Sequence, residues 1–288
     1  MTSDEEREPM KISKKITVAL AITLLATGLA SCAKAKPVAC SPETNSLATL
    51  TPGTLTIATG EPAYEPWVLN DAPETGKGFE AAVAYAVAKQ LGFENKCVKW
   101  VRTTFDSAIT PGEKTFDFNI QQYSITDERA KVVDFSSAYY FSNQAIVSAK
   151  GSKIEGVTTI AGLKDAKLGA AVGSTSLDTI EVQLGLKAQV FNDNAAAVAA
   201  LKNGQIDGLV VDFPTAYYLA QVEVDNGIIV GQFENRDLND KGAGLLLAKD
   251  SPITASVTAA LDAIRTSGEL QAIQDKWLTT AAGAPVLK

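Results

Sequence analysis

The sequence contains no histidine among its 288 residues. Histidine is the commonest general base near neutral pH and the commonest protein ligand for metals, so its absence argues against acid–base catalysis. We expect neither a bound metal nor another cofactor. The chain is also poor in basic residues, with 26 lysines and arginines against 33 aspartates and glutamates and a net charge of −7. Without a basic stripe to neutralise phosphates, a nucleic-acid partner is not expected.

One uncharged, largely apolar run, 16–29, lies near the amino terminus between a cluster of lysines and the small residues of 30–32. A basic region, an apolar stretch of about 7–15 residues and a small-residue cleavage site define a secretory leader. A membrane-spanning helix would need about 20 apolar residues, and a core helix would not be apolar on every face. We therefore predict a signal peptide over 1–31. Acidic residues before Met10 favour a start at Met10.

The segment Leu29-Ala30-Ser31-Cys32 resembles the lipobox of bacterial lipoproteins. The resemblance implies that Cys32 is acylated, for example with palmitate, and becomes the first mature residue. More than one acyl chain would be needed for stable membrane anchoring. Residues 32–52 then read as a polar, flexible tether. We expect the protein at the cell surface, on the outer face of the cytoplasmic membrane, or in the periplasm.

Cysteine is scarce, with three in the chain. Besides Cys32, the sequence has Cys40 and Cys97, which would share an oxidising compartment. They either form one disulfide that joins the tether to the first domain or remain as two free thiols. We favour the disulfide.

Beyond the tether, short apolar runs alternate with segments of helical periodicity. Phe79, Val83, Val87 and Leu91 recur every four residues and predict one face of a helix. Further helices are predicted around 177–184, over 194–202 with Gly204 after its end, and from Ser251-Pro252 toward 264. Strands are predicted at 55–59, 97–101, 116–120, 168–172 and 208–211. This alternation favours two α/β units with mainly parallel sheets.

Residues 117–140 contain Ser-Ile-Thr-x-x-Arg (124–129), then Val-Asp-Phe-Ser (133–136) and Tyr-Tyr (139–140). This pattern resembles the signature of family 3 solute-binding proteins, the polar-amino-acid receptors of ABC importers. Segments around Gly78, Gly173, Gly204 and Asp275 fall in the family's order. The resemblance implies an α/β fold of the type II periplasmic-binding-protein class, with two α/β lobes and a ligand cleft between them. It also implies a cognate ABC permease as partner and a monomeric chain.

The lobe boundaries follow from the resemblance. We expect lobe 1 to comprise 53–144 and 242–288, and lobe 2 to comprise 148–236. The two crossing segments would be 145–147 and 237–241.

An amino acid carries a carboxylate and an ammonium group, and a cleft that excludes water must compensate both charges. Arg129 matches the arginine that binds the carboxylate in the family, and a guanidinium fork suits that role. Thr175, with Ser174 and Ser176, opens a helix whose N–H groups favour an anion, although a serine there also serves as an ordinary helix cap. Asp212 ends a strand where α/β sheets place ligands and is expected to bind the ammonium group.

The ligand's side chain is expected to lie between Tyr64 and Phe105, which match the family's aromatic positions. Ser124 and Gln122 are further candidate contacts from the same motif as Arg129. Gln121 and Gln122 depart from the family's small residues and would narrow the pocket. Asp207 opens a strand, so we interpret it as structural.

The charges give a slight preference for the ligand. Arg129, Asp212 and Glu61, which matches an acidic family position, sum to −1 and favour a cationic amino acid such as arginine, lysine or ornithine. The two glutamines would equally suit a neutral polar side chain such as that of glutamine. Two other functions are carried by related folds. One is a dehydratase, in which Glu61 would serve as the acid or base, and the other is a signalling receptor.

Overall fold

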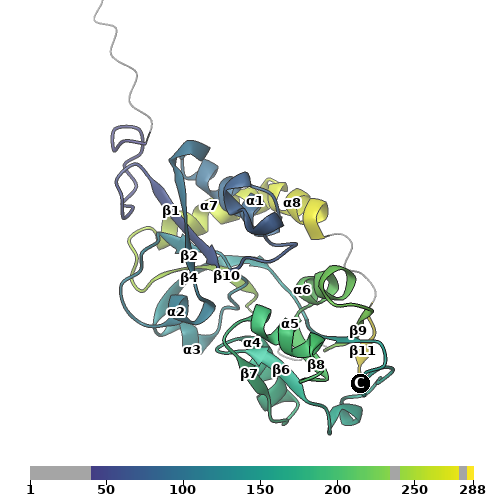
Figure 1. The fold of residues 1–288 in the computed structure, drawn as a ribbon. Helices are drawn as coiled ribbons and strands as arrows, with labels where there is room; N and C mark the ends of the chain where they lie inside the picture. Colours follow the sequence, from purple (N-terminus) through teal and green to yellow (C-terminus); the bar gives the residue numbers. More distant parts are fainter. Residues whose placement is uncertain (1–39, 234–240, 279–283) are drawn as a thin grey trace, which may run out of the picture. The chain divides into compact units, whose positions relative to one another are not determined.

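The computed structural model describes residues 40–233, 241–278 and 284–288. They form two separate sheets with strand orders β2-β1-β3-β10-β4 and β11-β9-β5-β8-β6-β7 (Figure 1). We refer to the elements around the first sheet as lobe 1 and those around the second as lobe 2. The α/β fold with two lobes, expected from the sequence, is confirmed.

The first sheet has a short central strand that pairs with a parallel neighbour on one side and an antiparallel one on the other. Its strands are β1 (Leu55–Gly60), β2 (Val98–Thr103), β3 (Phe118–Asn119), β4 (Val133–Tyr140) and β10 (Ala243–Ala248). Its long helices are α1 (Phe79–Gln90), α7 (Thr254–Thr266) and α8 (Glu269–Leu278). These three helices pack against one another (Figure 1). The predicted stripe of α1 is buried at Phe79, Val83 and Val87, which anchors the lobe 1 core.

Two short helices on lobe 1 carry residues near the candidate site. They are α2 (Phe105–Ile109) and α3 (Asp127–Ala130). Each begins after a threonine whose hydroxyl accepts a backbone N–H of the first turn, Thr104 from Ser107 and Thr126 from Arg129. Such caps satisfy amide donors that have no partner inside the helix. The Thr126 cap fixes the start of the helix that carries Arg129.

Lobe 2 has the strands β5 (Gln144–Ala149), β6 (Leu168–Ala171), β7 (Gln189–Phe191), β8 (Gly208–Asp212), β9 (Gly227–Phe233) and β11 (Val286–Leu287). Its helices are α4 (Thr175–Asp178), α5 (Asn194–Lys202) and α6 (Phe213–Tyr218). Five-residue π-helical turns follow α4 at Thr179–Gln183 and α6 at Leu219–Glu223, and 3-10 turns lie at Leu69–Asp71, Pro73–Thr75, Asn95–Cys97 and Ile160–Leu163. In Figure 1, the green part of the chain contains the strands β6, β7 and β8 and the helices α4, α5 and α6.

The expectation of mainly parallel sheets is confirmed, and each sheet contains one strand that runs against the others. β10 runs antiparallel to β3 and β4, and β5 runs antiparallel to β8 and β9. Both antiparallel strands follow a passage of the chain from one sheet to the other. A strand that arrives from the other lobe is not joined by a βαβ crossover, so the rule that makes such strands parallel does not apply.

Two predicted boundaries are wrong. Residues 145–147 are fully buried in the middle of β5, because this apolar stretch pairs with strands on both sides. The crossing segment is the three residues between β4 and β5, 141–143. Residues 284–288 belong to lobe 2, since β11 pairs with β9 and Leu287 is buried. The second predicted crossing segment, 237–241, lies outside the described residues except for Lys241.

The part of the predicted tether that the structure describes, residues 40–52, lies against lobe 1. The sulfurs of Cys40 and Cys97 are bonded at 2.06 Å. Asn45 Nδ2 donates to the Leu91 carbonyl at 2.8 Å, and the Leu50 N–H donates to Asp117 Oδ1 at 2.8 Å. The signal peptide and Cys32 lie outside the described residues. No helix in the described ranges has the length and apolar character needed to cross a bilayer.

The C-terminal helix begins later than predicted. The sequence predicts Ser251 as its cap and Pro252 as its first residue, but α7 starts at Thr254 after Ile253, which provides no side-chain cap. The Ser251 carbonyl instead accepts the Thr254 N–H at 3.2 Å. The chain therefore makes one extra turn before the helix.

Candidate ligand-binding site

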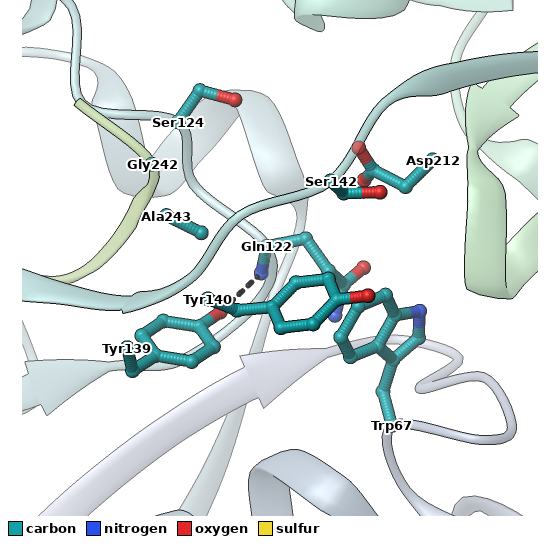
Figure 2. Close-up of a pocket in the computed structure, with 9 residues that line it drawn as sticks. All are labelled: Trp67, Gln122, Ser124, Tyr139, Tyr140, Ser142, Asp212, Gly242 and Ala243. Atoms are coloured by element: carbon teal, nitrogen blue, oxygen red, sulfur yellow. Dashed lines mark hydrogen bonds between the residues drawn. The ribbon is translucent and has the colours of Figure 1, made fainter. Parts of the chain in front are cut away.

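A pocket lies where the two lobes meet the crossing segment 141–143. It is lined by Trp67, Gln122, Ser124, Tyr139, Tyr140, Ser142, Asp212, Gly242 and Ala243 (Figure 2). Most of these residues belong to lobe 1, whereas Asp212 is the last residue of β8 in lobe 2. The pocket therefore lies at the carboxyl end of β8, where open α/β sheets place their ligands. Among the residues predicted from the sequence, Gln122, Ser124 and Asp212 line it directly.

An aromatic cluster forms one wall of the pocket. The ring of Trp67 lies 5.9 Å from Phe79 and 5.6 Å from Tyr140, in tilted and edge-on arrangements. Burial raises the pKa of Tyr140 to about 12, so its hydroxyl keeps its proton. Trp67 is buried, and its indole Nε1 donates to Thr215 Oγ1 on α6 at 2.7 Å. This hydrogen bond joins a lobe 1 wall residue to lobe 2.

The Trp67–Thr215 hydrogen bond gives a direct prediction. Thr215→Val should leave the buried indole N–H without a partner and lower the unfolding free energy by about 1–3 kcal/mol. Urea denaturation measures the change. Thr215→Ser, which keeps the hydroxyl, is the matched control and should stay close to wild type. Equal stability of the valine and serine variants would contradict the assigned role of this hydrogen bond.

Arg129 is buried on α3 and touches both lobes. Its Nη1 donates to the Ser124 carbonyl at 2.8 Å, and its Nη2 donates to the Gly173 carbonyl at 2.7 Å. Its guanidinium carbon lies 5.5 Å from the ring centre of Phe105. Burial lowers the pKa of Arg129, which the charges of Asp178 and Asp212 oppose. In the described part of the chain, Arg129 has only neutral hydrogen-bond partners and no ion pair.

The turn between β6 and α4 and the first residues of α4 carry the predicted hydroxyl residues Ser174, Thr175 and Ser176, and the Gly173 carbonyl of this turn bonds to Arg129. Gly173 has φ of 69°, a conformation that favours glycine, and lets the chain turn into α4. Thr175 Oγ1 lies 3.2 Å from Ser124 Oγ on lobe 1. Ser174 caps α4 by accepting the Leu177 N–H at 3.1 Å, so it has the structural role considered as the alternative. Thr175 is thus the hydroxyl of this turn that reaches lobe 1.

A chain of two hydrogen bonds joins Ser176 to Asp212 through the Gln144 side chain. Ser176 Oγ donates to Gln144 Oε1, and Gln144 Nε2 donates to Asp212 Oδ1 at 2.7 Å. Gln144 and Asp212 are register partners on the antiparallel strands β5 and β8, which holds the amide beside the carboxylate. The carboxylate is thereby oriented at the edge of the pocket.

Asp207 takes the structural role expected for it. Its Oδ2 accepts the Lys167 N–H at 2.8 Å and lies 3.3 Å from Lys153 Nζ. Ser148 Oγ donates to its carbonyl at 2.6 Å. These contacts hold the beginning of β8 beside β5 and β6, away from the pocket.

Seven of the ten predicted contacts are not among the residues that line the pocket. Four of them, Arg129, Ser174, Thr175 and Ser176, are described above, and the other three are Glu61, Tyr64 and Phe105. Glu61 is exposed. Tyr64 packs against the lobe 1 core, and its buried hydroxyl has no partner in the described ranges. Burial, and then the charges of Asp193 and Glu223, raise the pKa of Tyr64. Phe105 stacks on Tyr123 at 4.5 Å.

The two adjacent glutamines turn to different partners. Gln121 Oε1 accepts from the Tyr123 hydroxyl at 2.9 Å, and its amide lies against Gly60. Gln122 lines the pocket and bonds to Glu80, which is fully buried. Only the second amide therefore narrows the pocket.

Glu80 and Trp67 belong to the site, and the sequence alone did not predict either of them. Glu80 lies in the Gly78-Phe79-Glu80 segment, and the available signal for a buried carboxylate was an acidic residue in an otherwise apolar first turn of the predicted helix. Trp67 gave no comparable signal, because its partner Thr215 is 148 residues away. In the described ranges no group of three His, Cys, Asp or Glu side chains could hold a metal ion.

The known proteins that this chain resembles are solute-binding proteins. The model of the bacterial extracellular solute-binding proteins, family 3, matches residues 55–280. The L-cystine-binding protein TcyJ of Escherichia coli K12 is 30% identical over 243 residues, which cover 82% of this chain and 85% of that protein. The ABC transporter glutamine-binding protein GlnH of Bacillus subtilis is 29% identical over 212 residues, covering 72% and 75%.

A solved structure shows the same fold. An ancestral arginine-binding protein bound to glutamine matches with a TM-score of 0.66 and 31% identity. The match covers 78% of this chain and 98% of the ancestral protein.

Proposed function

Because this chain belongs to the bacterial extracellular solute-binding proteins of family 3, we propose that it is the extracytoplasmic substrate-binding component of an ABC importer. Its ligand is a polar L-amino acid, held in the pocket between the lobes. The similar proteins named above bind cystine, glutamine or arginine, so they support the class of ligand and leave the side chain open.

The observation that carries this proposal is the placing of Arg129 and Asp212. Arg129 is a buried cation bonded to two neutral carbonyls, one from each lobe. Asp212 is an anion on the opposite lobe whose charge acts on Arg129. A ligand with one carboxylate and one ammonium group is complementary to a buried cation on one lobe and an anion on the other.

The roles of the individual residues follow. The ligand's carboxylate takes the place of the Gly173 carbonyl on Arg129 and also accepts hydrogen bonds from Thr175 and Ser124. The ammonium group binds Asp212, whose carboxylate Gln144 orients. Because both lobes contribute, binding favours the state in which they are in contact.

The structure removes the reason for preferring a cationic amino acid as the ligand, which the sequence suggested. Glu61 supplied the extra negative charge that favoured a cationic ligand, and it is exposed outside the pocket lining. The same position was the acid or base of the dehydratase alternative, so amino-acid binding explains the site better than that reaction does. Tyr64 and Phe105 remain candidate contacts for the ligand's side chain.

A thermal-shift panel of the twenty amino acids with ornithine and citrulline tests the proposal. A ligand present at about 1,000 times its Kd adds about 4 kcal/mol to the unfolding free energy. At least one polar L-amino acid should raise the melting temperature at millimolar concentration. If none of them does, the proposed function is wrong.

We also propose that Cys32 is lipidated and anchors the protein to the outer face of the cytoplasmic membrane. Cys32→Ala should move the protein from the membrane fraction to the medium or periplasm, or leave it uncleaved. Fractionation with carbonate washing measures this, and Cys40→Ala is the control that should stay membrane-bound. Membrane retention of a cleaved Cys32→Ala variant would show that the anchor lies elsewhere.

A further inference from the structure

A buried carboxylate lies directly behind the pocket wall. Glu80 is the second residue of α1 and is fully buried. It accepts hydrogen bonds from the Tyr139 hydroxyl, the Gln122 backbone N–H at 2.8 Å and Gln122 Nε2. No ion pair in the described part of the chain includes Glu80. Two of its partners, Tyr139 and Gln122, line the pocket (Figure 2).

Gln122 is held by Glu80 at both its backbone and its side chain. Its φ of 51° lies in the left-handed region, which costs free energy for a residue other than glycine. The two hydrogen bonds to one carboxylate compensate this cost, and the Gln122 N–H also lies 3.1 Å from the Tyr139 hydroxyl. The side-chain amide is therefore fixed rather than free to rotate.

The orientation of the Gln122 amide determines whether its donor, Nε2, or its acceptor, Oε1, faces the ligand. An ionised carboxylate only accepts hydrogen bonds, so it holds the Nε2 donor end of Gln122. The carbonyl Oε1 is the end left for the pocket. Gln122 Oε1 and the Asp212 carboxylate then give this part of the pocket two acceptors. A ligand side-chain carboxylate beside these two groups would meet two acceptors and no donor from either of them.

We propose that Glu80 is a positioning residue that fixes the Gln122 amide and makes the pocket select amino acids whose side chains donate hydrogen bonds, against those with a carboxylate side chain. This inference rests on the proposed function and deepens it, since it names the ligand class. It favours amide or guanidinium side chains and disfavours aspartate and glutamate.

The protonation of Glu80 should modulate this selection. Burial raises the pKa of Glu80 to about 7, and the charge of Asp212 acts in the same direction, whereas the hydrogen bonds from Tyr139 and Gln122 oppose it. Protonated Glu80 becomes a donor and can hold Gln122 Oε1, which turns Nε2 toward the pocket. The preference for donors should therefore be strong at pH 8 and weaker at pH 6.

Calorimetric titration with L-glutamate and with the tightest ligand of the thermal-shift panel tests the inference, and L-glutamine is the probe isosteric with glutamate. In the wild type at pH 8, L-glutamate should bind at least about 100-fold more weakly than the tightest ligand. The ratio of the Kd for L-glutamate to the Kd for the tightest ligand measures the selection. The Glu80→Gln side chain can donate to Gln122 Oε1, so this variant should lower the ratio by about 10-fold or more, as expected for losing one matched buried hydrogen bond. The ratio in this variant should no longer change between pH 6 and pH 8.

Two further variants complete the test. Gln122→Leu removes the amide but keeps Glu80, and it should lower the ratio as well. Glu94→Gln, at an exposed ion pair with Lys96, is the control and should leave the ratio unchanged. The inference is overturned if wild-type affinity for L-glutamate is within 10-fold of the best ligand, or if Glu80→Gln and Gln122→Leu both keep the wild-type ratio. Binding of no amino acid at all would instead refute the proposed function.

Discussion

Arg129→Ala is expected to weaken amino-acid binding by roughly 30- to several-thousand-fold, the largest effect of any single substitution in the site. Removing one member of a desolvated charge pair leaves the other without compensation, which typically costs about 2–5 kcal/mol. At about 1.4 kcal/mol for each factor of ten in Kd, this range gives the expected loss. Arg129 is buried and also joins Ser124 to Gly173, so both carboxylate binding and contact between the lobes are affected.

Calorimetry with the best ligand of the thermal-shift panel measures the loss. Arg265→Ala is the matched control, because Arg265 is an exposed arginine that pairs with Asp262 on α7. It should bind like wild type. Arg129→Lys keeps the charge but lacks the planar guanidinium fork that binds the Ser124 carbonyl and the ligand's carboxylate together, so its affinity should lie between those of wild type and Arg129→Ala. Affinity of Arg129→Ala within a factor of three of wild type would contradict the assigned carboxylate site.

Loss of the Cys40–Cys97 disulfide is expected to lower the unfolding free energy by about 4 kcal/mol. A crosslink between residues 57 positions apart restricts the unfolded chain, and the loop-entropy relation gives this magnitude for a loop of that length. The crosslink also fastens residues 40–52 to lobe 1, where hydrogen bonds from Asn45 and Leu50 hold the same segment.

Urea denaturation of the double variant Cys40→Ala, Cys97→Ala measures this change. Wild-type protein unfolded in the presence of a reducing agent is the control, since it loses the crosslink without a change of side chains. The two should agree to within about 1 kcal/mol. A double variant as stable as the oxidised wild type would show that the crosslink contributes nothing.

Local patterns predicted much of this fold. The buried stripe at Phe79, Val83 and Val87 identified α1, and short apolar runs identified β1, β2, β6 and β8 within a few residues. These elements are visible because burial of one face leaves a period in the sequence. Asp212 was found because it follows an apolar strand directly.

The missed features depend on residues far apart in the chain. Residues 145–147 are apolar whether they cross between lobes or lie within a strand, so their pattern could not place the crossing segment. Trp67 and Thr215 are 148 positions apart, and nothing local pairs them. Likewise, Glu80 becomes a site residue only because Gln122 from the loop after β3 folds against it. Long-range hydrogen bonds of this kind leave no periodic signal.

The measurement that tests the central claim most directly is a crystal structure with the L-amino acid that gives the largest thermal shift. The ligand should lie in the pocket lined by Trp67, Gln122 and Asp212, with its carboxylate within hydrogen-bonding distance of Arg129 and its ammonium group on Asp212. A ligand found at any other place, such as the apolar groove lined by Pro66, Tyr217 and Trp277, would contradict the account. So would a ligand in the pocket whose carboxylate makes no contact with Arg129.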